Sequence, residues 1–149
     1  MRIVLQQVSS ATLLIEKEQI QRKIGKGMII YLWIHVDDLE DYPLKIEKIM
    51  KKIPSLKCLV GDSWNIDTSL QELQGDILLV SNFTLFGRNH KGLKMDFMYS
   101  APYLKAKAIY EYFIEQAKKE WRNMQTWEFW ADMRIESVNE GPINYVFDF

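Results

Sequence analysis

The first two stretches of the chain, residues 2–8 and 11–17, are rich in Val, Ile and Leu and are separated by Ser9-Ser10. Short apolar-rich runs bounded by polar residues are typical of β-strands. Residues 28–34 form a continuous apolar run after a turn at Gly25-Lys26-Gly27, and such a run indicates a strand buried on both faces. The N-terminal region therefore predicts three successive strands.

Two later stretches carry apolar residues at helical spacing. The first follows Asp37-Asp38, a candidate cap, has Pro43 early and ends at Pro54. The second begins at residues 100–102. The apolar positions are Tyr42, Ile46, Ile49, Met50 and Ile53 in the first helix, and Ala106, Ile109, Tyr110, Phe113, Ala117 and Trp121 in the second. Each set lies on one face of its helix, so both helices are expected to pack against a sheet.

The remaining strands are expected at residues 56–60, 77–80, 129–138 and 143–148. Residues 77–80 are continuously apolar and lead directly into the polar residues that follow. Two helices against a largely antiparallel sheet make an α+β fold. The sequence shows no internal repeat or linker, so residues 1–149 are expected to form a single domain.

Composition narrows the function classes. Among 149 residues, 48% are hydrophobic and 26% charged, as in ordinary globular proteins, and neither a signal peptide nor a membrane-length apolar run is evident. Cys58 is the only cysteine, which fits a reducing compartment and a cytoplasmic location. With only His35 and His90 beside it, we expect no metal site, and no cofactor motif is present. The net charge of −1 argues against nucleic-acid binding through the overall charge of the protein. Binding through a local basic patch is still compatible with this net charge.

Two segments stand out as candidate chemistry, because no histidine or carboxylate is placed as a convincing base. SNFTLF, residues 81–86, puts hydroxyls and an amide directly after a buried strand. NEGPIN, residues 139–144, puts a Gly-Pro pair inside the C-terminal β-region. From the residues alone, the first could simply satisfy backbone groups at a strand end, and the second could be a turn or a β-bulge.

Taken together, an ordered series of motifs resembles the D-aminoacyl-tRNA deacylases over nearly the whole chain. In chain order the matching segments are Arg2-Ile3-Val4-Leu5-Gln6, Ile24-Gly25-Lys26-Gly27, Leu79-Val80-Ser81-Asn82-Phe83-Thr84-Leu85, Lys91-Gly92 with Phe97, Ala131-Asp132-Met133 and Asn139-Glu140-Gly141-Pro142. The order of the segments is far more specific than any one of them.

The resemblance implies an enzyme that hydrolyses the ester of D-aminoacyl-tRNA, with glycyl-tRNA as a further candidate substrate, as a proofreading step in translation. It also implies a barrel-like sheet and a homodimer with active sites at the subunit interface. The Gly-Pro bond, cis in the family, would enter the partner's pocket and exclude L side chains sterically. The residues that match family positions are Ser81, Asn82, Phe83 and Thr84 as the catalytic stretch, Phe129, Met133, Asn139, Gly141 and Pro142 as substrate-binding residues, and Lys91, Lys94 and Phe97 as tRNA-binding residues.

Two mechanisms stay open at this point. Thr84 could act as a nucleophile, or backbone N–H groups near Phe83 and Thr84 could stabilise the oxyanion while the 2′-hydroxyl of tRNA assists. The absence of a convincing base favours the second. The basic loop around Lys91 and Lys94 is either a tRNA contact or a solvated loop.

Several positions depart from the family pattern. Asn82 replaces the usual Gln, Asn144 replaces Thr, Gln7 replaces Arg, and Trp33 and Trp130 fall where glycine is usual. A chirality-relaxed paralogue that accepts L-alanyl-tRNA, which also has Gln-Gln at this point, is therefore one alternative. Others are a non-catalytic nucleic-acid-binding homologue, which the lack of a basic tail disfavours, and a homologue inactivated by Asn82.

Overall fold

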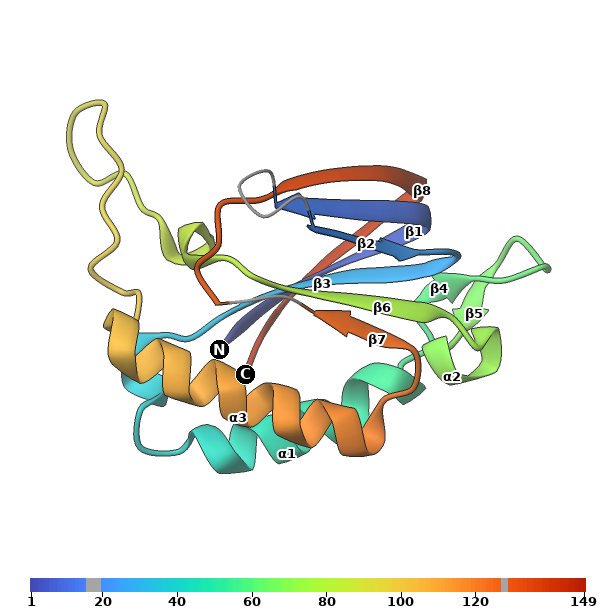
Figure 1. The fold of residues 1–149 in the computed structure, drawn as a ribbon, viewed down its shortest axis with the longest axis horizontal. Helices are drawn as coiled ribbons and strands as arrows, with labels where there is room; N and C mark the ends of the chain where they lie inside the picture. The colour runs from blue at the N-terminus through green and yellow to red at the C-terminus, as the bar shows by residue number, and fades with distance from the viewer. Residues whose placement is uncertain (16–19, 127–128) are drawn as a thin grey trace.

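The computed structural model of the protein describes residues 1–15, 20–126 and 129–149 (Figure 1). Its strands are β1 (Arg2–Ile15), β2 (Ile20–Ile24), β3 (Gly27–Trp33), β4 (Leu59–Val60), β5 (Ile66–Thr68), β6 (Asp76–Ser81), β7 (Met124–Thr126) and β8 (Arg134–Asp148). Its α-helices are α1 (Tyr42–Ser55), α2 (Leu70–Leu73) and α3 (Tyr103–Glu120), and its 3-10 turns are η2 (Val36–Asp38) and η3 (Phe83–Phe86).

Strand β1 organises the main sheet. It pairs antiparallel with β2, β3 and β8, whereas β3, β6 and β7 run parallel to one another, which gives the order β2-β1-β3-β6-β7 with β8 on β1. The sheet is thus mixed, with its antiparallel part around β1. It curls into a nearly closed barrel, and α1 and α3 lie side by side below it in Figure 1. The α+β class and the barrel-like sheet are confirmed.

Alternating side chains of the central strands feed two hydrophobic clusters. Met28, Ile30 and Leu32 of β3 face the cluster shared with the helices, whereas Ile29 joins the cluster on the other face. In β6, Ile77 and Leu79 join the cluster shared with the helices, and Leu78 and Val80 join the cluster on the other face. The continuous apolar runs therefore follow from burial on both faces, as expected for strands in the middle of a covered sheet.

The two long strands correct the sequence-based boundaries. β1 runs unbroken through Ser9-Ser10, and β8 runs unbroken through Gly141-Pro142, so the predictions of a break at each position were wrong. The register between β1 and β8 shifts on both sides of Val8. This irregularity allows both strands to continue through Ser9-Ser10 and Gly141-Pro142, which look like turns in the sequence. Residues 129–133 precede β8 rather than belong to a strand, and residues 16–17 of the second predicted strand lie outside the described residues.

The helices also differ from expectation at their ends. α1 begins at Tyr42, after the separate turn η2, and Pro54 lies inside its last turn rather than ending it. Asp38 is buried in η2, where it pairs with Lys45 at 2.6 Å and with the Met1 amino group at 2.6 Å. The prediction missed β2, β5, β7 and the one-turn helix α2. Among the described residues, no helix has the length and apolar character needed to cross a membrane.

Candidate functional site

A cleft of about 510 Å³ lies where the parallel pair β3 and β6 ends. The last paired residues are Leu32 and Ser81, after which the chain leaves the sheet and turns into η3. The residues that line the cleft are Tyr31, Trp33, Val80, Ser81, Asn82, Phe83, Thr84, Trp130, Ala131, Asp132, Met133 and Ile135. The whole predicted catalytic stretch therefore lies on one cleft, beside the Ala-Asp-Met segment.

Asn82 fixes the conformation of the turn that follows β6. Its side-chain Oδ1 accepts hydrogen bonds from the Thr84 backbone N–H at 3.2 Å and from the Thr84 hydroxyl at 2.6 Å. An Asn side chain is short enough to bond the backbone two residues on, which is why Asn is favoured at such turns. The residue that departs from the family pattern is therefore accommodated by a local cap, and the Thr84 hydroxyl is held by an amide.

The turn leaves one backbone donor without a partner. The Phe83 N–H has no hydrogen-bond acceptor among the residues that the structure describes, whereas its carbonyl accepts a hydrogen bond from the Ser100 hydroxyl at 3.1 Å. Gly87 closes the turn by donating its N–H to the Thr84 carbonyl at 2.9 Å. Such a turn, tied at its carbonyls, can present a fixed N–H to an anionic oxygen.

Aromatic rings form one wall of the cleft. Trp130 stacks on Phe83 with 4.8 Å between ring centroids, and Trp33 lies 5.7 Å from Trp130. Phe129 stacks on Trp33 at 5.2 Å from behind and is only 7% exposed. Phe129 therefore supports the wall, and it is not among the residues that line the cleft.

Hydrogen bonds within β8 and between β8 and β1 hold the Gly141-Pro142 segment in its conformation. Its peptide bond is cis, and Gly141 has a φ of 108°, a conformation that favours glycine. The Asn139 side chain donates to the Gln7 carbonyl at 2.8 Å and to the Ile143 carbonyl at 3.3 Å. Asn139 thus spans the Gly-Pro pair and fixes it to the neighbouring strand.

The structure does not bring this segment to the cleft of the same chain. Met133 lines the cleft, but Asn139, Gly141 and Pro142 do not. Gly141 and Pro142 are exposed on β8 instead. Of the predicted substrate-binding residues, one therefore joins the catalytic stretch directly, Phe129 supports it, and the others stand apart.

The predicted tRNA-binding residues lie on the loop that follows η3 and projects from the body in Figure 1. Lys91 and Lys94 are exposed, and Asn89 braces the loop by donating to the Gly92 and Lys94 carbonyls at 3.0 and 3.2 Å. Phe97 packs edge-on against Phe83 at 4.9 Å. The base of the loop is therefore continuous with the aromatic wall.

Titratable groups are sparse in the cleft. Asp132 is the one carboxylate among the described residues that line it, and burial raises the pKa of Tyr31. His35 packs against Phe86 and Tyr99 and accepts the Asp37 N–H at 3.1 Å, away from the cleft. No group of metal-binding side chains occurs within the described residues. The cleft thus offers hydrogen-bond donors, hydroxyls and rings rather than an acid–base pair.

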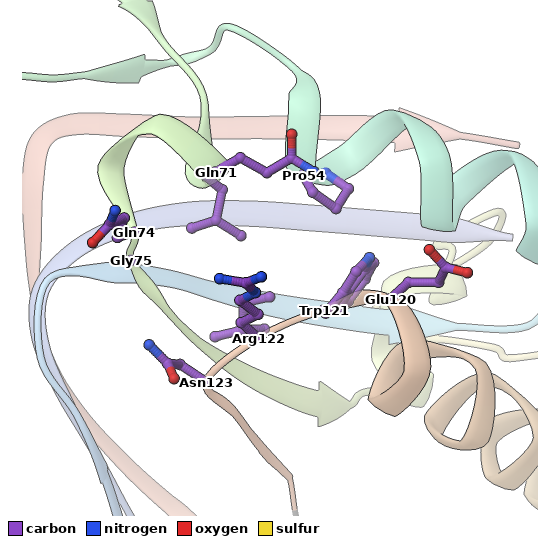
Figure 2. A pocket seen from close by; sticks show the side chains of 10 residues that line it. Pro54, Gln71, Gln74, Gly75, Glu120, Trp121, Arg122 and Asn123 are labelled. Atoms are coloured by element: carbon purple, nitrogen blue, oxygen red, sulfur yellow. The ribbon is translucent and has the colours of Figure 1, made fainter.

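A larger hollow of about 580 Å³ lies at the other end of β6 (Figure 2). Gly75 and Ile77 mark the start of the strand there, and Gln71, Gln74 and Arg122 stand at its rim. None of the motif residues lines it. The larger hollow therefore does not coincide with the predicted site residues.

Sequence reasoning missed two cleft residues, Tyr31 and Ile135. Each lies two positions from a residue that was noticed, Tyr31 from Trp33 and Ile135 from Met133. Because side chains two apart share one face of an extended segment, the period-two rule could have found both.

Comparisons with known proteins identify the family of the chain. The family model described as D-Tyr-tRNA(Tyr) deacylase matches residues 4–148. The D-aminoacyl-tRNA deacylase of Thermosipho melanesiensis is 36% identical over 99% of this chain and 97% of its own length, and that of Clostridium kluyveri is 34% identical with the same coverage.

Two solved structures share the fold. The c-Myc DNA unwinding element binding protein superposes with a TM-score of 0.87 at 30% identity, covering 100% of this chain and 99% of its own. A probable eukaryotic D-amino acid tRNA deacylase superposes with a TM-score of 0.77 at 18% identity, covering 99% of this chain and 98% of its own. Since a single family accounts for the sequence from one end to the other, the chain belongs to the D-Tyr-tRNA(Tyr) deacylase family.

Proposed function

We propose that this chain hydrolyses the ester bond of D-aminoacyl-tRNA, releasing the D-amino acid and free tRNA, in the cleft at the end of β6. One observation carries the proposal. The stretch that matches the family's catalytic residues, Ser81 to Thr84, lies on one cleft, and the Phe83 N–H beside it has no acceptor within the described residues. The names of the relatives, matched over almost their full length, supply the substrate class.

The chemistry rests on the turn and not on an acid–base pair. A water oxygen attacks the ester carbonyl, and the Phe83 N–H stabilises the oxyanion that forms. The ribose 2′-hydroxyl next to the ester relays the proton from the water to the departing 3′-oxygen. The Thr84 hydroxyl donates to Asn82 and has no base within the described residues to activate it, which supports a positioning role for Thr84.

A second copy of the chain completes the site in this proposal. Gly141 and Pro142 are exposed and do not line their own cleft, so they are available to another subunit. Val138 and Val146, at 59% and 64% exposure, lie on the same strand β8 and are exposed apolar residues that a partner could cover. In a two-fold dimer the same contact would complete both clefts.

A deacylation assay tests the function directly. D-tyrosyl-, L-tyrosyl-, glycyl- and L-alanyl-tRNA are incubated with the enzyme, and the remaining ester is measured over time. We expect rapid loss of D-tyrosyl-tRNA and no loss of L-tyrosyl-tRNA. Loss of L-alanyl-tRNA would identify a chirality-relaxed enzyme, and stability of all four esters would defeat the proposal.

A nucleic-acid-binding role is the second candidate, because the 30% identical relative is named for binding a DNA unwinding element. The discriminating experiment adds a DNA duplex to the same assay. DNA binding without hydrolysis of any ester would favour this candidate, whereas hydrolysis that DNA does not inhibit favours the enzyme.

A further inference from the structure

Trp130 has an unusual backbone conformation beside the cleft. Its φ is 70°, in the left-handed region that bulky L-residues rarely adopt. Its side chain is nevertheless 49% exposed. Residues held in sparsely populated backbone regions cluster at active sites and ligand contacts. A strained, half-exposed tryptophan that lines the cleft is therefore a candidate for contact with a ligand.

The indole is placed to meet a ligand in the cleft. It stacks on Phe83 at 4.8 Å with 23° between the planes, and Tyr103 meets it edge-on at 5.4 Å. The Trp130 backbone N–H points to the Ser81 hydroxyl at 3.5 Å. The ring thus stacks on Phe83, whose N–H has no acceptor among the residues that the structure describes, and its backbone lies against Ser81, the first residue of the predicted catalytic stretch.

The neighbouring residues show what a purely structural ring looks like in this region. Phe129 is 7% exposed and Trp33 is 1% exposed, and both are locked in the core by each other's rings. Trp130 also contacts the rings of Phe83, Tyr103 and Trp33, yet it stays 49% exposed and lines the cleft. An exposed aromatic ring in a cleft can stack on another flat ring.

We propose that Trp130 is a substrate-binding residue that stacks on a flat ring of the aminoacyl-tRNA end, and so sets which substrates this enzyme holds. The inference rests on the proposed function and deepens it. Two parts of that substrate carry such a ring, the terminal base and an aromatic D-amino acid side chain. On this proposal, the strained backbone at φ 70° is kept because it holds the Trp130 ring in position for binding.

Binding is measured by calorimetry with two unreactive probes, adenosine carrying D-tyrosine or D-alanine in amide linkage at the 3′ position. Trp130→Gly removes the ring and suits the left-handed backbone, Trp130→Phe keeps a ring, and Trp130→Leu keeps apolar bulk. We expect Trp130→Gly and Trp130→Leu to weaken probe binding roughly 5- to 100-fold, the range for one stacking contact, and Trp130→Phe to retain most of the affinity. In the deacylation assay KM should rise while kcat changes little.

The two probes separate the two rings. Equal weakening for both probes assigns the stacking partner to the base, and weakening for the D-tyrosine probe alone assigns it to the amino acid. Unchanged affinity of both probes for Trp130→Leu, or equal weakening by Trp130→Phe and Trp130→Leu, overturns the inference. Calorimetry measures binding without turnover. A wild-type protein that binds the probes but hydrolyses no ester would therefore count against the proposed function, and the probe affinities of the Trp130 variants would still test this inference.

Discussion

The Thr84 hydroxyl is a residue-scale test of the mechanism. Because it donates to Asn82 at 2.6 Å and has no base beside it in the part of the chain that the structure describes, we expect Thr84→Ala to lower kcat by less than about tenfold, far less than loss of a catalytic nucleophile. Single-turnover deacylation of D-tyrosyl-tRNA measures the effect. A loss of about a thousandfold or more would restore Thr84 as the nucleophile.

Asn82 shows what the sequence could and could not reveal at this scale. The position of the stretch after a buried strand was predictable from the apolar run that precedes it. Its hydrogen bonds were not, because whether a shorter amide weakens the site depends on the turn it caps. In the structure its Oδ1 reaches both the backbone and the hydroxyl of Thr84. The shorter side chain of Asn82 therefore does not disrupt the turn, and such a disruption was the simplest way in which Asn82 could inactivate the enzyme.

Gly27 provides a stability prediction. A Cβ at Gly27 would lie 2.0 Å from the Asp76 backbone oxygen, at the start of the parallel pair β3 and β6. Since backbone cannot yield like a flexible side chain, Gly27→Ala should lower the free energy of unfolding by at least about 1–3 kcal/mol in urea denaturation. Gly25→Ala is the matched control, because its Cβ would meet Asp76 Oδ2 at an ordinary 3.5 Å. Equal stability of the two variants would contradict the close strand approach.

At the scale of elements, the strong periodic signals gave the helices and the buried strands correctly. The errors occurred where polar residues lie inside long strands. Ser9-Ser10 and Gly141-Pro142 look like breaks, but the register shifts around Val8 let β1 and β8 continue past them. Such irregularities depend on the partner strand, so a local pattern cannot reveal them. The short elements β5, β7 and α2 carry too few residues to show a period.

The projecting loop yields an electrostatic prediction. Lys91 and Lys94 are exposed near Phe97, which contacts the aromatic wall of the cleft. Replacing both by Gln should weaken tRNA binding and reduce the slope of log K against log salt by about 1–2, because each phosphate contact contributes a slope of nearly one. Filter binding at several salt concentrations measures this. The control is Lys118→Gln with Lys119→Gln at the far end of α3, and an equal effect of the two pairs would indicate a general charge effect only.

Helix α2 provides a pH prediction. The Glu72 carboxylate accepts hydrogen bonds from Lys57, from the Ser69 N–H and from the Ser69 hydroxyl, and these lower its pKa from 4.5 to about 2. A lowered folded-state pKa means that stabilisation is fully present above pH 4.5 and is lost as the pH falls towards 2. The stability difference between wild type and Glu72→Gln should therefore be present at pH 6 and vanish near pH 2. A pH-independent difference in urea midpoints would contradict this assignment.

At the scale of the whole molecule, the family's two functional motifs lie in different places. Ser81 to Thr84 line the cleft with Met133, whereas Gly141-Pro142 is exposed on β8 and does not line it. The family resemblance could predict that the two motifs act in different subunits. The pattern of apolar and polar residues could not, because it does not indicate in which subunit a residue acts. In the proposed dimer, each chain would contribute one cleft and, to its partner's cleft, one exposed Gly-Pro segment.

This division predicts that two inactive variants can rescue each other. Ala131→Trp fills the cleft, and Gly141→Val disrupts the Gly-Pro segment, because any Cβ there meets Ile143 Cγ1 at 2.7 Å and the φ of 108° disfavours side chains. Each homodimer should be nearly inactive. After subunit exchange, the mixture should regain about a quarter of wild-type activity, because random pairing makes half of the dimers mixed and each keeps one intact site. Activity that stays at the level of the separate variants, while co-purification of differently tagged subunits shows mixed dimers, would mean that each chain completes its own site, and Gly141 and Pro142 would then need another role.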